Sequence, residues 1–471
     1  MTVRELIDRA PVTRLQVMVI ALCFLLNMLD GLDVMAIAYV APSLSGSLKL
    51  SANSLGAVFS AGVIGTTLGA LFIAPYADLY GRRTLILSSL LFICVTMTLT
   101  GFASSFWEFF LIRLVNGLGI GAMLASLTTM GAEYMPNRHR NLAIGILHSG
   151  YLIGATVGGF FAAWLIPAFG WQAVFFAGGI VAMLLAPVIY FFMPESLQFL
   201  SERSPPRGLE KFNAIMDRMR LPSCSALPPR EMAETLRPGV RALLAPDFKS
   251  STLMVWLAFF ATFVSLYFVQ SWMPKMVVDA GLDLSYGIYA GVAVNMGGAV
   301  GAILLGYWSA TAGLHRLITI FLIAGSLSMI VFGFSPTNAI WLLSISLFIG
   351  FFMLAGFIGL YVVTARVYPT QVRTTGIGWA VGAGRAGAIC SPFLGGLLIS
   401  LESSKAVNFA LFAIPLLIAG LAIWRLRPSK SAAAVLPNPR RVHPSPSKRI
   451  HREYQRAVNI APLRAILGPA P

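Results

Sequence analysis

Charged residues are scarce in this chain of 471 residues. Asp, Glu, Lys and Arg together account for 11% of the sequence and hydrophobic residues for 57%, whereas about 25% charged residues is typical of soluble domains. So few charges cannot cover the surface of a water-soluble globule of this length. We therefore expect a membrane protein.

Cysteine and histidine are also rare, with four and five copies. The cysteines form no CxxC pair and are scattered along the chain, so we expect no disulfide, no metal site and no cofactor. The sequence also lacks the nucleophile and base constellation or the metal cluster that a membrane enzyme would need, and we expect no enzymatic activity. The four cysteines are Cys23, Cys94, Cys224 and Cys390.

Long apolar runs take the place of the missing charge. Each is about 20 residues or longer, enough for a helix to cross roughly 30 Å of hydrocarbon. The runs must be helical because lipid offers no partners for backbone N–H and C=O groups. We expect an all-α membrane protein with twelve transmembrane helices, at residues 15–43, 54–76, 84–103, 107–131, 142–166, 172–193, 250–274, 286–309, 316–335, 338–362, 375–400 and 406–426.

Acidic residues are few beside basic ones, 18 against 34, which gives a net charge of +16. A basic chain can bind nucleic acid, but here the positions of the charges indicate orientation instead. Only Lys49, Lys275 and Lys405 fall in loops on one side of the predicted helices. Nearly all the others share the opposite side with both termini. By the positive-inside rule we place both termini in the cytoplasm and the chain in the inner membrane, without a nucleic-acid partner.

The sequence repeats itself at an offset of 232 to 233 residues, which predicts two parallel six-helix units with a site between them at mid-depth. We expect bundles at 1–193 and 250–427, and a cytoplasmic linker at 194–249 with a short helix near Leu209–Arg220. Residues 428–471 form a basic, proline-rich tail that we expect to be disordered, with an affinity for anionic lipid or with no specific role. Matching pairs include Pro42 and Pro274, Gly65 and Gly297, Gly69 and Gly301, Gly81 and Gly313, and Pro136 and Pro369.

Two carboxylates lie inside the first predicted helix, at Asp30 and Asp33. Charge at this depth is costly and marks a functional site unless it has a partner or water. The i, i+3 spacing places both on one helix face, and crowding of like charges favours proton exchange near neutral pH. Alternatively, both cap a distorted helix or lie at the outer interface.

Two arginines also lie inside predicted helices. Arg113 precedes a run of small residues, which predicts close helix packing and an inward-facing cation that senses the protonation of the aspartates or ties helices together. Arg385 is flanked by Gly384 and Gly387, which clear space around it, and its repeat position is Leu152. A guanidinium in one half only suits a carboxylate ligand, with a fixed ion pair as the alternative.

Further candidates lie at the cytoplasmic helix ends. Glu133 and Arg366 occupy matching repeat positions with opposite charge, which predicts a salt bridge in gating or a place on a proton path. A tight turn is predicted at Asp78, Gly81, Arg82 and Arg83. Such a turn can lock neighbouring helix ends and release them as the two halves move.

Trp272 and Tyr361 are aromatic residues in predicted helices seven and ten. Their rings could stack on an aromatic ligand, although anchoring at the membrane interface is equally ordinary.

The turn motif from Asp78 to Arg83, with Pro194-Glu195-Ser196, resembles the major facilitator superfamily over the chain up to about Arg427. Ala74 and Leu79 depart from the motif. A closer resemblance, to the aromatic acid/proton symporter family, rests on Asp30-Gly31-Leu32-Asp33 and on Gly384-Arg385-Ala386-Gly387 followed by Pro392.

This resemblance implies proton-driven import of aromatic acids such as benzoate, 4-hydroxybenzoate and vanillate. It implies that Asp30, Asp33 and the arginines Arg113 and Arg385 are essential. We expect a monomer whose partners are protons, a small aromatic carboxylate and membrane lipid. The alternatives are a proton-antiport exporter of drugs or metabolites, which the missing proline before Gly158-Gly159 disfavours, and an importer of a non-aromatic organic acid.

Overall fold

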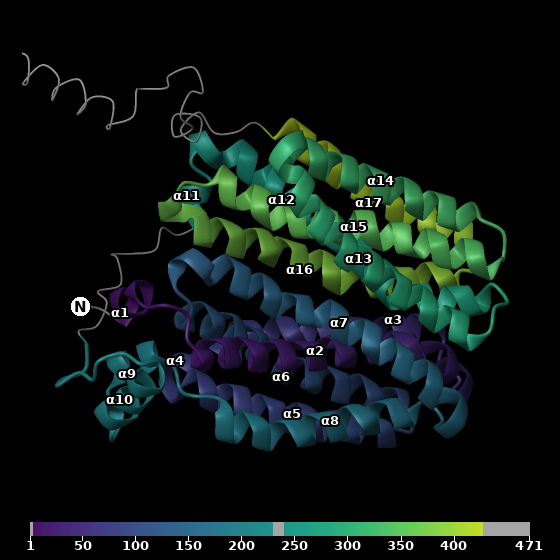
Figure 1. Cartoon of the computed structure of the whole chain (residues 1–471). Helices are drawn as coiled ribbons and strands as arrows, with labels where there is room; N and C mark the ends of the chain where they lie inside the picture. Colours follow the sequence, from purple (N-terminus) through teal and green to yellow (C-terminus); the bar gives the residue numbers. More distant parts are fainter. Residues whose placement is uncertain (1–2, 229–239, 427–471) are drawn as a thin grey trace, which may run out of the picture. The chain divides into compact units, whose positions relative to one another are not determined.

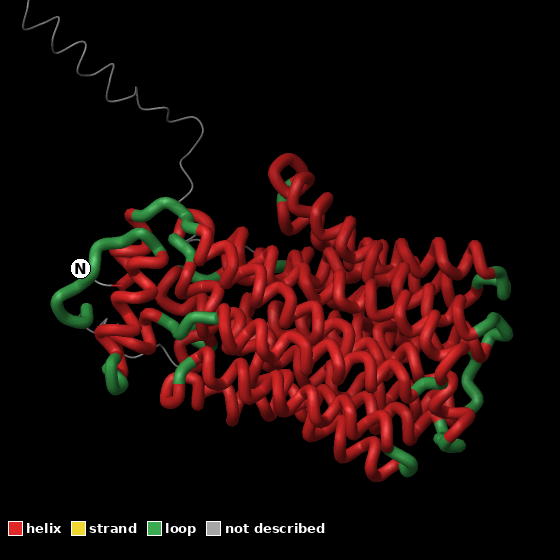
Figure 2. The backbone as a smooth tube through the Cα atoms, turned by 60° about the horizontal axis from the view of Figure 1, so that its bottom comes forward, coloured by secondary structure: helices red, strands yellow, loops and turns green. Residues whose placement is uncertain are grey.

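The computed structural model describes residues 3–228 and 240–426, and within these ranges the regular secondary structure is helical throughout (Figure 2). Twelve of the described helical segments are long and apolar enough to cross a membrane, which confirms the predicted number of spans. The predicted disorder and lipid affinity of the tail after Arg427 concern residues outside the described ones.

The spanning helices run several residues further than the apolar runs alone indicated, because their polar ends also carry helical backbone. The second span begins as α3 and continues through η1, a π-helical turn, η2, a 3₁₀ turn, and the short α4. In chain order the spans are α2 (Arg14–Ser47), α3 (Ala52–Leu68) with η1 (Gly69–Ile73), η2 (Ala74–Tyr76) and α4 (Ala77–Tyr80), α5 (Arg82–Phe102), α6 (Phe106–Tyr134), α7 (Asn137–Phe169), α8 (Gln172–Phe192), α12 (Pro246–Asp279), α13 (Leu284–Ala312), α14 (Leu314–Phe334), α15 (Ala339–Val367), α16 (Thr370–Ser400) and α17 (Lys405–Arg425).

The internal repeat of the sequence is also a repeat of helix packing. Each helix from α12 to α17 begins 232 or 233 residues after its counterpart in the first half, as Pro246 follows Arg14 and Lys405 follows Gln172. The packing partners match as well: α2 packs on α7 as α12 does on α16, and α3 packs on α6 as α13 does on α15. We call α2 to α8 the first bundle and α12 to α17 the second bundle; they occupy the lower and upper parts of Figure 1.

Glycines that bring helix backbones together are duplicated in the same register. A Cβ added to Gly65 would stand 2.0 Å from the carbonyl oxygen of Leu114, and one added to Gly297 would stand 2.0 Å from that of Leu347. Gly154 and its repeat mate Gly387 likewise face the carbonyl oxygens of Met28 and Phe260, at 1.9 and 2.5 Å. Any side chain at these positions would push the helices apart, so the glycines set the spacing within each bundle.

The two bundles meet near one end of the helices. Ser60 Oγ of α3 donates to the Ile389 carbonyl of α16 at 2.8 Å, and the Phe59 and Trp272 rings meet edge to face at 5.3 Å. Gly159 of α7 lies against Val292 of α13. Toward the other end, Gly145 of α7 and Gly378 and Gly382 of α16 have open space where a side chain would be. The residues described here therefore close the boundary at one end and leave space beside α7 and α16 at the other.

Short helices gather at the end where this space lies (Figure 1). α10 (Gly208–Arg218) confirms the short helix expected near Leu209–Arg220. α1 (Val3–Arg9) was not among the predicted helices; its Asp8 accepts a hydrogen bond from the backbone N–H of Asn137 at 2.7 Å. The remaining short helices are α9 (Leu197–Arg203) and α11 (Val240–Leu243).

The glycine contacts give the first testable prediction. Gly154→Ala places a methyl group against the Met28 carbonyl and should destabilise the protein by about 1 to 3 kcal/mol, the usual effect of overpacking. Unfolding temperature and the monodisperse fraction in detergent measure this. Gly145→Ala on the same helix is the matched control: with open space around it, it should be neutral or slightly stabilising because alanine favours helix by about 1 kcal/mol. Equal destabilisation by both changes would contradict the prediction.

Candidate functional site

Asp33 is held by donors from α6. Arg113 Nη1 donates to its Oδ1 at 2.8 Å and Nη2 to its backbone carbonyl at 3.3 Å, while Asn116 Nδ2 donates to its Oδ2 at 2.5 Å. Thr96 Oγ1 of α5 in turn donates to Asn116 Oδ1 at 2.6 Å. Asp33 and Asn116 are fully buried and Arg113 is 3% exposed. This network neutralises two buried charges and satisfies both carboxylate oxygens.

Asp30, one helical turn before Asp33, has a different environment although both point inward. It is 2% exposed, and its Oδ1 has no hydrogen-bond partner among the described residues. Its charge interacts with those of Asp33 and, across the boundary between the bundles, of Arg385. A buried carboxyl without a dedicated donor is stable when protonated or when water or a ligand reaches it.

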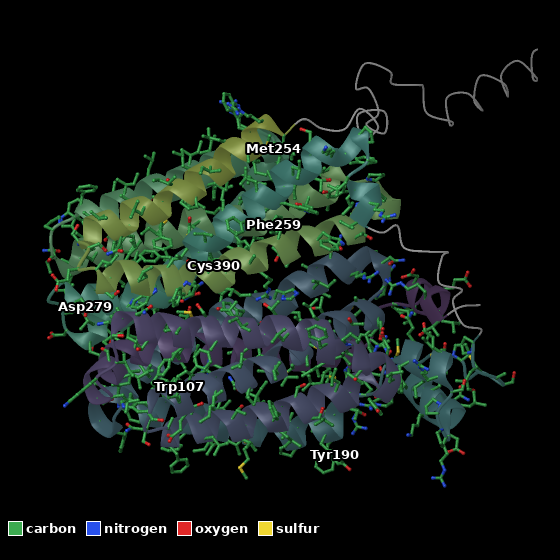
Figure 3. The ribbon with its side chains drawn as sticks, turned by 180° about the vertical axis from the view of Figure 1, so that it is seen from behind. Trp107, Tyr190, Met254, Phe259, Asp279 and Cys390 are labelled. Carbon is green, nitrogen blue, oxygen red and sulfur yellow. The ribbon has the colours of Figure 1, made fainter. Side chains whose placement is uncertain are left out.

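Arg385 lies on α16, which runs along the boundary with the first bundle (Figure 3, where Cys390 marks the helix). Its side chain is only partly buried, and its hydrogen bond to the described residues is a long one of 3.4 Å from Nη1 to the hydroxyl of Tyr267. Tyr151 of α7 interacts electrostatically with both Arg385 and Asp30. Much of the guanidinium's hydrogen-bonding capacity is thus free for a ligand.

Aromatic rings surround the position beside Arg385. Phe263 stacks on Tyr267 with ring centres 5.7 Å apart and meets Phe357 edge to face at 5.1 Å. Tyr361 packs edge to face on Phe357 at 5.4 Å and on Phe259 at 5.2 Å. We call Phe259, Phe263, Tyr267, Phe357 and Tyr361 the aromatic cluster. Arg385 therefore lies beside a set of ring faces and edges, an arrangement that suits an aromatic anion.

The glycines around Arg385 do not all clear space for the guanidinium. A Cβ on Gly384 would meet the Phe263 ring at 2.9 Å, and one on Gly387 would meet the Phe260 carbonyl at 2.5 Å. Only Gly382 of this run faces open space. Gly384 and Gly387 therefore fit α16 to α12, which is what brings Arg385 close to the aromatic cluster.

Trp272 lies outside the aromatic cluster. It is fully buried, donates from Nε1 to the Pro392 carbonyl at 3.0 Å and packs on Phe59 of the first bundle. In this arrangement its ring belongs to the contact that closes one end of the boundary.

The predicted turn motif forms a charge cluster within the first bundle. Arg82 pairs with Asp78 at 2.8 Å and with Glu133 at 3.2 Å, and Glu133 also accepts a hydrogen bond from Ser196. Gly81 has a positive φ of 99°, a backbone conformation that favours glycine. Arg83 donates its backbone N–H to Glu195 at 3.1 Å. Arg366 is exposed on α15 of the second bundle and takes no part in this cluster.

Comparison with known proteins agrees with this architecture. The model of the Major Facilitator Superfamily matches residues 23–380, with a second match at 290–470. The chain belongs to the major facilitator superfamily. It is therefore a multi-pass membrane protein of a transporter family.

Several curated relatives are similar over most of their length. A gallate transporter of Pseudomonas putida is 33% identical, covering 89% of this chain and 94% of its own. The 4-hydroxybenzoate transporter PcaK of Acinetobacter baylyi is 30% identical, covering 89% and 93%. The 3-(3-hydroxy-phenyl)propionate transporter of Escherichia coli is 30% identical, covering 88% and 94%.

Solved structures show the same fold at low sequence identity. A D-xylose-proton symporter superposes with a TM-score of 0.67 at 15% identity, covering 88% of this chain and 98% of its own. The inward-open xylose transporter XylE of Escherichia coli gives 0.67 at 17% identity, covering 87% and 96%.

Sequence reasoning missed several residues that complete the site. Tyr151 and Tyr267 are ordinary within apolar helices, and only their position relative to Asp30 and Arg385 gives them a role. A weak signal existed for Tyr267: counting helical turns places it on the same face of α12 as Phe263, four residues earlier.

The unequal environments of the two aspartates predict unequal effects on stability. Asp33→Asn removes the partner of buried Arg113 and should destabilise the protein by about 3 to 5 kcal/mol, whereas Asp30→Asn should change stability little. Unfolding temperature in detergent is the measurement. If Asp30→Asn proved the more destabilising change, the assignment of a structural pair to Asp33 and Arg113 would be wrong.

Proposed function

We propose that this protein imports small aromatic carboxylates together with protons, by alternating access between the two bundles. The observation that carries the proposal is the position of Arg385. This partly buried cation makes only a long hydrogen bond to the described residues, lies beside the aromatic cluster and interacts with Asp30 across the bundle boundary. The names of the relatives support the substrate class, since gallate, 4-hydroxybenzoate and hydroxyphenylpropionate are all aromatic carboxylates.

In this mechanism Arg385 binds the substrate carboxylate through its fork of donors, and Tyr361 and Tyr267 contact the ring. Asp30 carries the proton, because Asp33 is already neutralised by Arg113 and hydrogen-bonded by Asn116. With Asp30 protonated and the substrate charge balanced by Arg385, the boundary between the bundles holds less uncompensated charge. The desolvation penalty for closing the site is then smaller when both the proton and the substrate are bound.

The other predicted residues take supporting roles in this proposal. Asp33 and Arg113 fix the register of α2 against α6 and hold Asp30 in place. Trp272 seals the closed end with Phe59 rather than stacking on the substrate. The cluster of Asp78, Arg82 and Glu133, with Gly81 and Arg83 forming its turn, keeps the helix ends of the first bundle together as it moves, and Arg366 acts at the matching end of the second bundle.

We further propose that the bundles, 1–193 and 250–427, move as units linked by 194–249, and that the protein works as a monomer in the inner membrane with both termini in the cytoplasm. The distribution of Lys and Arg supports this orientation. With this orientation, the closed end of the boundary faces the periplasm and the open space beside Gly145 and Gly382 faces the cytoplasm.

The decisive experiment is uptake of radiolabelled benzoate, 4-hydroxybenzoate and gallate by proteoliposomes under an inward proton gradient. We expect accumulation of at least one acid, abolished by an uncoupler. In Asp30→Asn, accumulation should be lost while exchange of labelled for unlabelled substrate continues, because exchange needs no net proton movement. Full accumulation by Asp30→Asn would remove this residue from coupling, and accumulation unaffected by the uncoupler would exclude proton coupling.

Arg385→Lys tests the substrate contact itself. The charge stays but the fork of donors is lost, so affinity should fall by about 1.5 to 3 kcal/mol. Binding of the transported acid to purified protein measures this, with Arg425→Lys, at the exposed end of α17, as the matched control. Arg113→Lys should slow turnover more than it weakens binding. Unchanged affinity in Arg385→Lys with a large loss in Arg113→Lys would reverse the two assignments.

A further inference from the structure

A second polar group lies one turn from Asp30 on the side that leads to the open space. Asn27 is 1% exposed and precedes Asp30 by three residues on α2, so both share a helix face. Asn27 Nδ2 contacts His148 Nδ1 of α7 at 3.5 Å, and His148 Nε2 contacts Thr128 Oγ1 of α6 at 3.3 Å. The three side chains continue the polar line of Asp30 from the middle of the first bundle.

Two acceptor atoms in this line have no partner. Asn27 Oδ1 and Asp30 Oδ1 are both buried without a hydrogen bond among the described residues. Two buried acceptors one helical turn apart are unfavourable, since each loses water and gains no hydrogen bond. A single proton on Asp30, donated directly or through a water molecule to Asn27 Oδ1, would satisfy both atoms at once.

His148 connects this line of polar side chains to the open space beside α7. Its side chain is exposed, in contrast to Asn27 and Asp30, and three residues away on α7 stands Gly145, which faces open space. Imidazole is the side chain best suited to accept and release a proton near neutral pH.

We propose that His148 accepts the proton of Asp30 and passes it to the cytoplasmic side, with the amide of Asn27 as the bridge. The proposal rests on the proposed function and names its proton-release path. The proton leaves the Asp30 carboxyl through water and binds His148 Nδ1, and His148 then releases a proton to bulk water. Before the transfer, the Asn27 amide accepts a hydrogen bond from the protonated Asp30 carboxyl and donates one to the neutral His148 ring. After the transfer, the Asn27 amide turns over, so that it donates a hydrogen bond to the Asp30 carboxylate and accepts one from the His148 imidazolium.

Other groups around His148 leave Asp30 as the proton donor. α2 contributes Asn27 and, one turn further, Asp30; Asp33 beyond it is paired with Arg113 of α6. α6 contributes Thr128, and α7 itself contributes Tyr151. The titratable side chain of α8 is Tyr190, which stacks with Arg83. α13 meets α7 near Gly159 and Phe160, three turns away.

The test separates proton release from substrate movement. In proteoliposomes, His148→Gln and Asn27→Leu should keep exchange of 4-hydroxybenzoate within about twofold of the native protein. Net uptake driven by a proton gradient should fall by roughly 100-fold or more, the usual scale for removing a proton-transfer group. The pH dependence of net uptake should also flatten. His139→Gln, at the exposed start of α7, is the matched control and should behave as the native protein.

Each outcome decides the proposal. Native net uptake and pH profile in His148→Gln would overturn it, and so would equal loss of exchange and uptake in a well-folded variant, which indicates a packing role. If His148→Gln does not fold, the same criteria apply to Asn27→Leu. Absence of gradient-driven uptake in the native protein would instead contradict the proposed function, which keeps the two failures distinct.

Discussion

A charge inside a lipid-embedded helix bundle needs a partner, because hydrocarbon offers no hydration. The structure meets this requirement for Asp33 by surrounding it with Arg113 and Asn116. Asp30 on α2 and Arg385 on α16, in contrast, have no ion-pair partner within 4 Å among the described residues. In the proposed mechanism a proton neutralises Asp30 and a substrate carboxylate pairs with Arg385, so the proposed coupling follows from where compensation is missing.

The two halves share their framework but not their chemistry. Glycine contacts recur in register, from Gly65 and Gly297 to Gly154 and Gly387. The acidic pair and Arg385, in contrast, have no charged counterparts: Leu152 stands at the repeat position of Arg385. Duplication thus preserved the spacing of the helices while the charged residues came to differ between the halves, with a cation and aromatic rings in one and two aspartates in the other.

The spans could be predicted from the sequence because hydrophobic length and backbone satisfaction leave few alternatives. The repeat could be predicted because its glycines and prolines keep a constant offset. The different environments of Asp30 and Asp33 could not, since i, i+3 spacing places both on one face and only the approach of α6 separates them. The position of Trp272 and the packing role of Gly384 and Gly387 likewise depend on contacts between distant segments, which no local pattern records.

The glycine contacts also have a mechanical consequence. Where backbone meets backbone, as at Gly154 and Met28, there are no rotamers to rearrange and little free volume to compress. The same kind of seam crosses the closed end of the boundary: a Cβ on Gly56 of α3 would stand 2.6 Å from the Pro392 carbonyl of α16, and one on Gly396 would stand 2.5 Å from the Ala52 carbonyl. A seam of this kind yields by parting rather than by bending, so any movement of one bundle against the other at this end should separate α3 from α16 as intact helices.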